Sequence, residues 1–268
     1  MDIKRVKLIY FSPTGTTQKV LDSIAQGIGA QVVERFNLTL PEGASQTIPP
    51  LSDELVILGA PVYGGRLPAE AIKRFRQIKA ENTLAVPVVL YGNREFEDSL
   101  LELKNLAIEL GCKPVAAGAF IGEHSFATEA LPIAMGRPDD DDLAKAQEFG
   151  AKIKNKIEVL ESPAVQEDLD IPGRFPYEGG VAAMAVSPVS KEDLCILCGT
   201  CASVCPTAAV TVDESVATEV ELCIRCSACV KNCPTGARVW EAPAMAKVTN
   251  WLHENCAARK EPQVFGVG

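Results

Sequence analysis

Residues 1–158 alternate between short apolar runs and longer amphipathic stretches. The apolar runs are rich in Val, Ile and Leu, which is typical of strands buried on both faces of a parallel sheet. We predict such strands at residues 5–11, 31–36, 54–60, 84–92 and 114–122. Stretches with helical periodicity cover residues 17–28, 69–78, 98–110 and 138–160. This alternation predicts an α/β domain, built as a doubly wound open sheet of five parallel strands.

Four consecutive aspartates, Asp139 to Asp142, open the last of these predicted helices. They admit two interpretations, a metal-binding cluster or the acidic first turn of a helix. We favour the second, because carboxylates in a first turn interact favourably with the helix dipole and Pro138 stands near the first helical position.

The pattern changes after residue 158, where residues 159–188 are rich in proline and glycine. We interpret this segment as an ordered connector between two domains. Phe175, Tyr177 and Met184 are the residues that we expect it to bury. Residues 189–242 then form a cysteine-rich domain.

Residues 243–268 begin with an amphipathic stretch that predicts one more helix, followed by a tail. Val248, Trp251, Leu252 and Cys256 fall near one face of this helix. We expect that face to pack against the body of the protein; docking of a partner is the alternative.

The formal net charge is −9, and 47% of the residues are hydrophobic, which is ample for a core. This charge argues against nucleic acid and anionic membrane surfaces as partners. No apolar run reaches the 18 or so residues of a transmembrane helix, and the first residues lack the long apolar segment of a signal peptide. We therefore expect a cytoplasmic protein without membrane insertion.

Eight of the ten cysteines lie within residues 195–233, in two copies of the pattern C-x2-C-x2-C-x3-C-P. In this pattern three thiolates surround one corner of an iron–sulfur cluster, and the fourth reaches toward the other cluster. The motif therefore predicts two [4Fe–4S] clusters with exchanged ligands. The first set is Cys195, Cys198, Cys201 and Cys233, and the second is Cys223, Cys226, Cys229 and Cys205.

Two other uses of these cysteines are disfavoured. Structural zinc prefers two separate cysteine pairs with a long gap between them, and disulfides are rare in a reducing compartment. Ile196 and Ile224 occupy matching positions in the two copies, and we expect both to shield a cluster from water. Cys112 and Cys256 lie outside the pattern, and we expect them to be inert buried thiols.

Residues 12–17, Ser-Pro-Thr-Gly-Thr-Thr, connect the first predicted strand to the first helix. Hydroxyls and backbone N–H groups at a helix N-terminus form an anion site that needs no lysine. The patterns G-x4-G-K-[ST] and G-x-G-x-x-G are absent, which argues against nucleoside triphosphates and dinucleotides. A simple helix cap is the alternative interpretation of this loop.

Two further loops follow the third and fourth predicted strands, at residues 60–66 and 91–98. Ligands of doubly wound sheets bind beyond the carboxyl ends of the strands, so all three loops would meet at one site. Gly64 and Gly65 would allow the backbone to approach a flat ring closely. Tyr63, Tyr91 or Phe96 would stack on the ring or belong to the core.

The phosphate loop resembles the FMN-phosphate signature of flavodoxins, and the cysteine repeat resembles bacterial two-cluster ferredoxins. Together they resemble flavodoxin–ferredoxin fusion proteins, which occur widely in anaerobic bacteria and archaea. This likeness implies a flavodoxin-like domain at residues 1–158 and a small α+β ferredoxin-like domain at residues 189–242. One departure is Thr16, where many flavodoxins carry Asn, but a hydroxyl can still cap the helix.

The resemblance also implies which residues bind FMN. The phosphate would be held by Ser12, Thr14, Gly15, Thr16 and Thr17. The ring would lie between two loops, which are Pro61, Val62, Tyr63, Gly64 and Gly65 on one side and Tyr91, Gly92, Asn93, Arg94 and Phe96 on the other. His124 and Ser125 follow the fifth strand on the same side, where His124 would relay a proton to the flavin or be an ordinary loop histidine.

These inferences predict an electron-transfer flavoprotein that passes electrons between two [4Fe–4S] clusters and FMN, and onward to protein redox partners with basic docking faces. A reductase of a small organic acceptor such as a quinone, supplied with electrons by the clusters, is the alternative. A sensor whose cluster state alters partner binding is a third hypothesis. The sequence leaves open whether the chain forms a homodimer.

Overall fold

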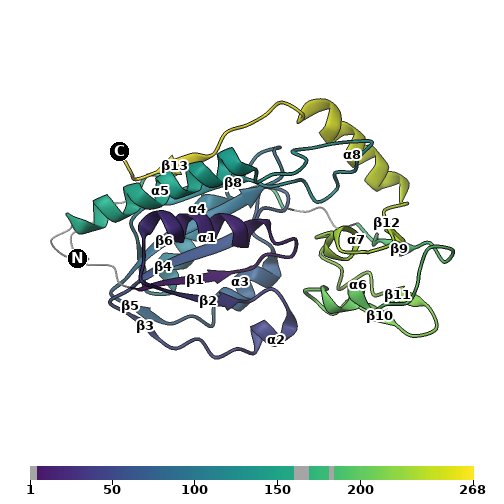
Figure 1. Ribbon diagram of the computed structural model, residues 1–268, viewed down its shortest axis with the longest axis horizontal. Coiled ribbons are helices and arrows are strands. Elements are labelled where there is room, and N and C mark those ends of the chain that lie inside the picture. Colours follow the sequence, from purple (N-terminus) through teal and green to yellow (C-terminus); the bar gives the residue numbers. More distant parts are fainter. Residues whose placement is uncertain (1–4, 160–168, 181–183) are drawn as a thin grey trace.

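The computed structural model describes residues 5–159, 169–180 and 184–268 (Figure 1). Its central sheet contains five parallel strands in the order β2-β1-β4-β6-β8. Numbered among themselves along the chain, these strands have the flavodoxin-like order 2-1-3-4-5. Their bounds are β1 Arg5–Tyr10, β2 Val32–Asn37, β4 Leu55–Pro61, β6 Thr83–Tyr91 and β8 Ala117–Ile121. The predicted doubly wound sheet is confirmed.

Helices cover both faces of this sheet, and each face has its own core. On one face, α1 (Thr16–Ile28) and α5 (Asp140–Glu158) pack side by side over the strands (Figure 1). On the other lie α3 (Ala69–Phe75) and α4 (Ser99–Glu109). Because both faces are covered, all nine residues of β6 are buried, which explains its continuous apolar run.

Two glycines allow α1 and α5 to approach closely. A Cβ atom on Gly27 would lie 1.9 Å from the carbonyl oxygen of Gln147, and one on Gly150 would lie 2.1 Å from that of Ile24. Any larger residue at either position would push the two helices apart.

Several short elements complete the flavodoxin-like part. Helix α2 covers Pro41–Ala44, β3 (Leu51–Ser52) pairs with β5 (Ala80–Glu81), and β7 (Cys112–Pro114) pairs with β6. The tail contributes β13 (Gln263–Phe265), which adds an antiparallel strand beside β8 at the edge of the sheet. The sequence pattern did not predict this return of the chain.

The aspartate run forms the first turn of α5, as the helical interpretation predicted. Asp139 is the N-cap and accepts a hydrogen bond from the Asp142 N–H, while the Asp142 side chain accepts one from the Asp139 N–H. This reciprocal capping box satisfies two backbone donors at the helix start.

The connector is described at residues 169–180, whereas residues 160–168 and 181–183 lie outside the described residues. Leu169 and Ile171 enter the core beside α4. The expectation for Phe175 was wrong, since it is 76% exposed. The backbone here is held by Asp98, whose carboxylate accepts the N–H groups of Arg174 (2.8 Å) and Glu178 (2.7 Å).

The cysteine-rich part contains two short helices, α6 (Thr200–Ser203) and α7 (Ala228–Lys231). Two small antiparallel pairs flank them, β9 (Val189–Ser190) with β12 (Arg238–Val239), and β10 (Val210–Val212) with β11 (Val216–Thr218). Thus the predicted small α+β domain follows the α/β domain.

Polar contacts, buried at Arg74 and exposed at Lys231, fix this part against the flavodoxin-like sheet. The guanidinium of Arg74 donates to the carbonyl oxygens of Leu38 (2.7 Å), Thr39 (2.6 Å) and Pro206 (2.6 Å). Lys231 donates to Glu123 (2.5 Å) and to the carbonyl of Ala127 (2.7 Å).

Helix α8 (Pro243–Asn255) follows the cysteine-rich part, and the tail then runs back across the molecule to β13 (Figure 1). Leu252 and Cys256 are buried against Ala127 and Ile133. The helix therefore packs on the body of the protein through Leu252 and Cys256, as expected, whereas Trp251 of the same predicted face is 52% exposed. None of the helices in the described ranges is both long and apolar enough to cross a membrane.

Candidate functional site

The loop between β1 and α1 is shaped to receive an anion. Gly15 takes up a left-handed conformation (φ 79°) directly before α1 begins. Ser12 braces the loop, because its N–H donates to Thr39 Oγ1 (2.8 Å) and its Oγ accepts from the Gln18 N–H (3.2 Å). The exposed N–H groups of the first helical turn then point toward any group bound in front of the helix.

Thr17 lies in the first turn of α1, next to this loop. Its hydroxyl is buried and has no hydrogen-bond partner among the described residues. Such a hydroxyl costs about 1–3 kcal/mol when it stays unsatisfied. The Thr14 and Thr16 hydroxyl oxygens are 3.5 Å apart, beside the same helix start. This donor set fits a phosphate group.

A cavity of about 300 Å³, the main cavity, opens at the carboxyl ends of the parallel strands. Its walls come from the loops after β1, β4, β6 and β8. The boundary between β1 and β4 is the point at which the strand order reverses, where doubly wound sheets bind their ligands. The predicted site residues that line it are Thr14, Thr16, Pro61, Val62, Tyr63, Gly64, Tyr91, Gly92 and Arg94.

The structure places the other predicted FMN residues behind this lining. Ser12, Gly15 and Thr17 shape the phosphate loop from within. Phe96 is buried in the core, with its ring 5.6 Å from that of Tyr91. Gly65 lies under Glu97, whose Oε2 would be 1.6 Å from a Cβ atom there.

Asn93 has a structural position instead of the predicted one against the ring. Its Nδ2 donates to the carbonyl oxygens of Cys256 (2.6 Å) and Ala258 (2.8 Å), and its Oδ1 accepts from the Lys260 N–H (3.4 Å). Both ends of this buried amide therefore hold the segment after α8. Sequence reasoning missed this role because it depends on a chain segment more than 160 residues away.

Two tyrosines reach the main cavity from the predicted loops. Burial, reinforced by the carboxylate of Glu95, raises the pKa of Tyr91 to about 12. The Tyr91 hydroxyl is buried and has no partner in the described part of the chain. Burial followed by the neighbouring Cys226 raises the pKa of Tyr63 well above its usual value. Both phenols are neutral, so each offers an O–H donor.

His124 lies in the wall of the main cavity in a fixed orientation. Its Nδ1 accepts the backbone N–H of Phe126 (3.1 Å), and its ring is packed against Gly92. Burial, then the charges of Lys231 and Arg94, lowers the pKa of His124 to about 4. At neutral pH the imidazole is uncharged, with its proton on Nε2. It can donate a hydrogen bond but does not hold a spare proton for relay.

One wall of the main cavity comes from segments to which the sequence analysis gave no part in flavin binding. Met184 of the connector, Ile224 and Arg225 of the second cysteine loop, and Trp251 of α8 all line it. No local motif marks these residues as neighbours of the phosphate loop. The amphipathic face of α8 was a partial signal, since Val248 and Leu252 on that face also line the cavity.

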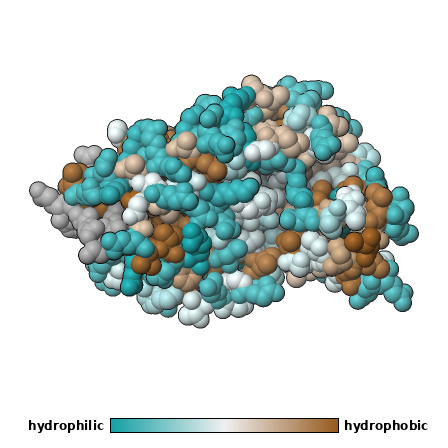
Figure 2. Space-filling view, in the orientation of Figure 1, coloured by the Kyte–Doolittle hydropathy of each residue, from teal (hydrophilic) through white to brown (hydrophobic). Residues whose placement is uncertain are grey.

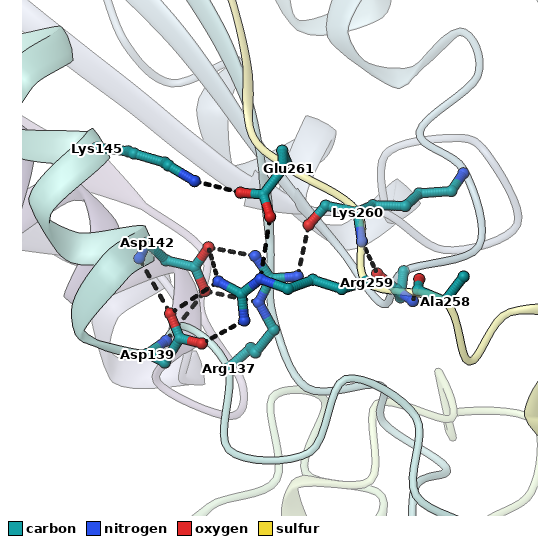
Figure 3. A network of polar contacts seen from close by, with 9 residues as sticks. Arg137, Asp139, Asp142, Lys145, Ala258, Arg259, Lys260 and Glu261 are labelled. Atoms are coloured by element: carbon teal, nitrogen blue, oxygen red, sulfur yellow. Dashed lines mark hydrogen bonds and ion pairs between the residues drawn. The ribbon is translucent and has the colours of Figure 1, made fainter.

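A network of charged residues holds the tail so that α8 stays at this wall (Figure 3). Arg137 pairs with the fully buried Asp142 and also donates to the Lys260 carbonyl (2.7 Å). Arg259 pairs with Asp139 (2.6 Å). This hydrogen bond lowers the pKa of Asp139 below its usual range. The aspartate run therefore has a second structural role, because it binds the returning tail.

The eight motif cysteines gather around two small cavities. Cys195, Cys198, Cys201 and Cys233 line one, which we call the outer cysteine site. Cys205, Cys223, Cys226 and Cys229 line the other, the inner cysteine site. These are the two exchanged sets that the motif predicts. Among the described residues, no group of His, Cys, Asp or Glu is arranged to hold a single metal ion.

The chain around these sites provides hydrogen-bond donors to sulfur. The Ala209 N–H donates to Cys205 Sγ (3.2 Å), and an Arg238 N–H lies 3.9 Å from Cys229 Sγ. Such contacts stabilise thiolates and tune the potential of a bound cluster. Burial raises the pKa of Cys226 to about 12, so a metal charge is needed to keep this thiolate.

The inner cysteine site adjoins the main cavity. Ile224 lines both, and Tyr63 of the main cavity lies close enough to Cys226 for the two groups to interact electrostatically. Cys112 and Cys256 lie elsewhere and are buried. Burial raises the pKa of Cys112 to about 12, which opposes reactivity.

Residues 194–237 match the family described as the 4Fe-4S dicluster domain. No curated protein matches the chain. Solved structures similar to its first part include an archaeal flavodoxin (14% identity, TM-score 0.36) and the Fusobacterium nucleatum flavodoxin bound to flavin mononucleotide (18%, TM-score 0.39). Each similarity covers 57% of this chain and 99% of the other.

A third similar structure is rubredoxin oxygen:oxidoreductase from Desulfovibrio gigas, with 14% identity and a TM-score of 0.39. This similarity covers 58% of the present chain but 36% of the other. The strand order of the sheet and the match at residues 194–237 show what the chain combines. It joins a domain with the flavodoxin-like strand order to a segment that matches the 4Fe-4S dicluster domain, the arrangement that a flavodoxin–ferredoxin fusion would have.

Proposed function

We propose that this protein binds one FMN in the main cavity and two [4Fe–4S] clusters in the cysteine sites, and that it carries electrons between redox proteins. The observation that carries the proposal is the position of Ile224, which lines both the main cavity and the inner cysteine site. A flavin and a cluster held there would be separated by little more than this side chain.

Support for FMN comes from the polar groups of the main cavity. The phosphate loop offers the Thr17 hydroxyl and the helix N-terminus, and the ring end offers the O–H of Tyr91 and the N–H of His124. Bound FMN would supply a centre that accepts either one or two electrons. Within the chain, Tyr63 and Gly64 would hold the ring, and Thr14 and Thr16 would orient the phosphate.

Support for the path of the electrons comes from the exposure of the two cysteine sites. Cys198 of the outer site is exposed, whereas Cys226 and Cys229 of the inner site are buried. Electrons from a partner would arrive at the outer site, pass to the inner site and end at the flavin. Since the sites belong to one chain, these internal steps would not depend on diffusion.

The outer site also has the surface that a redox partner needs. Figure 2 shows hydrophobic residues gathered at the right-hand end of the molecule, where Figure 1 places α6, α7, β10 and β11. The large apolar side chains exposed in the cysteine loops are Leu194, Ile196, Leu197 and Leu222. Glu192 and Asp193, which are also exposed, precede them. A partner with an apolar centre and a basic rim would fit this surface.

A carrier fits the main cavity better than a reductase of small organic acceptors does. Helix α8 places Val248, Trp251 and Leu252 in the cavity wall, and the tail network holds the helix there. This wall would narrow the approach of an organic acceptor to the ring.

The proposal is tested by anaerobic purification with iron, sulfide and flavin analysis. We expect about 8 Fe and about one FMN per chain. Reduction by a ferredoxin-type donor should be followed by rapid electron transfer to a flavodoxin-type or cytochrome acceptor, with slow turnover of quinones. Fast quinone turnover without a protein acceptor would establish the reductase instead, and a preparation with iron but no flavin would overturn the proposal.

A further inference from the structure

The two cysteine motifs stay similar beyond their last cysteines but differ at one buried position. Residues 205–210 read Cys-Pro-Thr-Ala-Ala-Val, and residues 233–238 read Cys-Pro-Thr-Gly-Ala-Arg. Val210 begins β10 and Arg238 begins β12, and both are buried, with exposed fractions of 6% and 2%. An arginine therefore lies in the interior where the other motif has an apolar side chain.

Among the described residues, two hydroxyls and a sulfur atom contact the guanidinium of Arg238, and no carboxylate forms an ion pair with it. It donates to Ser190 Oγ (3.1 Å), Thr218 Oγ1 (2.8 Å) and Cys229 Sγ (3.9 Å). Hydroxyls satisfy hydrogen bonds but carry no charge, and a buried cation is costly unless an anion compensates it. The cysteine sulfur is therefore the contact that indicates where the compensating charge lies.

Arg238 interacts with ligands of both cysteine sites. It lines the outer cysteine site, while its guanidinium contacts Cys229 of the inner site. The backbone N–H of Arg238 is hydrogen-bonded to the Cys233 sulfur, and its charge also acts on Cys201 and Cys223. One residue thus interacts with two predicted ligands of each cluster.

Apolar side chains join the two sites around this arginine. Cys201 of the outer site and Cys229 of the inner site are buried in one hydrophobic cluster with Val210. Val212, Val216 and Val230 pack against this cluster. Because charges are screened weakly in apolar surroundings, a cation held here would act on both sites.

We propose that Arg238 is a counter-charge shared by the two clusters, which stabilises the reduced form of each cluster and thereby sets both potentials. The inference rests on the proposed function. Four thiolates outweigh the positive charge of a [4Fe–4S] core, so a cluster together with its ligands is an anion. Reduction takes one electron from the external donor, breaks no bond and increases the negative charge. A fixed cation between the sites therefore favours reduction of both clusters.

The test is the midpoint potential of each cluster, measured on the full-length holoprotein by anaerobic titration followed by electron paramagnetic resonance. Arg238→Gln removes the charge but keeps a polar side chain, Arg238→Val copies the residue of the other motif, and Arg238→Lys keeps the charge. Ser190→Ala is the matched control, because it removes a hydrogen-bond partner of the guanidinium and leaves the charge in place. Signals of Cys205→Ser and Cys233→Ser assign each potential to its site.

We expect Arg238→Gln and Arg238→Val to make reduction of both clusters less favourable by about tenfold, which lowers each potential by about 59 mV for a one-electron couple. Arg238→Lys should retain most of each potential, and Ser190→Ala should leave both nearly unchanged. Three results would overturn the inference while the proposed function stands. They are unchanged potentials in a neutral variant that retains about 8 Fe, a shift in one cluster only, and an equal shift in Ser190→Ala.

Iron analysis decides the case in which both neutral variants lose a cluster. Retention of both clusters in Arg238→Lys would then support the need for a positive charge at this position. An equal loss of iron in Arg238→Lys would assign Arg238 a purely structural role and overturn the inference. A wild-type protein that binds one cluster only would instead contradict the proposed function itself.

Discussion

The outer and inner cysteine sites come from two copies of one sequence motif, yet they lie in unlike environments. Ile196 of the outer loop is 65% exposed, whereas its counterpart Ile224 is packed against the core of the flavodoxin-like domain. Pro234, which ends the second motif, is exposed, whereas Pro206, which ends the first, is buried and accepts a hydrogen bond from Arg74. Both isoleucines line their own cysteine site, where the sequence predicts that they shield a cluster, but only Ile224 is also packed against the core.

This difference follows from the way in which the two motifs share their cysteines between the two sites. Cys205 and Pro206 end the first motif but belong to the inner site, so the flavodoxin-like domain holds parts of both motifs. The two copies of one motif therefore form two sites that lie in different surroundings. One end faces solvent and the other faces the main cavity.

The largest effect is expected from substituting a cysteine that one motif contributes to the site of the other motif. Cys205→Ser should remove the inner cluster, although Cys205 lies in the first motif, and should lower the iron content from about 8 to about 4 per chain. It should also stop reduction of the flavin by external donors. Cys233→Ser should remove the outer cluster instead. Iron analysis and electron paramagnetic resonance measure both, and loss of the outer cluster in Cys205→Ser would contradict the assignment.

The second largest effect is expected from Arg74, which joins the inner cysteine site to the flavodoxin-like domain. Arg74→Met leaves the carbonyl oxygens of Leu38, Thr39 and Pro206 without their donor, so we expect a loss of about 3 kcal/mol in the free energy of unfolding. Arg76→Met is the control, because Arg76 forms an exposed pair with Glu109, and its effect should stay below about 0.5 kcal/mol. Anaerobic urea unfolding followed by circular dichroism compares the two, and equal midpoints would contradict this role.

His124, whose pKa is lowered by burial and by the nearby Lys231 of α7, makes stability depend on pH. Its folded pKa of about 4 lies below the usual 6.5, so the unfolded chain takes up the proton first as the pH falls. The stabilisation is complete above about pH 6.5 and is lost progressively toward pH 4, by up to about 3 kcal/mol.

This dependence should disappear in His124→Asn and persist in His253→Asn, which changes a histidine on α8. Urea midpoints measured across pH 4–7 test it. A His124→Asn protein with an unchanged pH profile would show that the imidazole is not the titrating group.

The smallest effect comes from trimming the two matched isoleucines. Ile224→Ala should cost about 1–2 kcal/mol because part of its side chain is buried against the core, whereas Ile196→Ala should change stability by less than about 0.5 kcal/mol. Urea unfolding of both variants measures the contrast. Similar losses in both would mean that the two loops are equally packed.

Much of the fold could be predicted because its signals are local. The strands appear as continuous apolar runs since they are buried on both faces, and the aspartate run marks the start of α5 since carboxylates in a first turn interact favourably with the helix dipole. Gly15, Thr14 and Thr16 follow a strand directly, so the phosphate loop was recognisable from the order of elements alone.

The rest of the site could not be predicted, because its contacts join distant parts of the chain. Nothing near Asn93 shows that it binds the backbone at Cys256 and Ala258 in place of a ligand. The amphipathic face of α8 includes Trp251, but nothing near Trp251 in the sequence shows that it lines the same cavity as Tyr63. Such contacts arise from packing, which a pattern of neighbouring residues does not encode.

The sequence by itself determined the five parallel strands, the long helices, their order and the grouping of the cysteines, because hydrophobic periodicity and ligand spacing are properties of short segments. Only the tertiary structure decided which cysteine site adjoins the main cavity and which faces solvent. The two motifs are nearly equivalent as sequences, and the difference between them comes from the surface against which each one is packed. That packing places Arg225 in the main cavity and leaves Leu197 at the edge of the molecule.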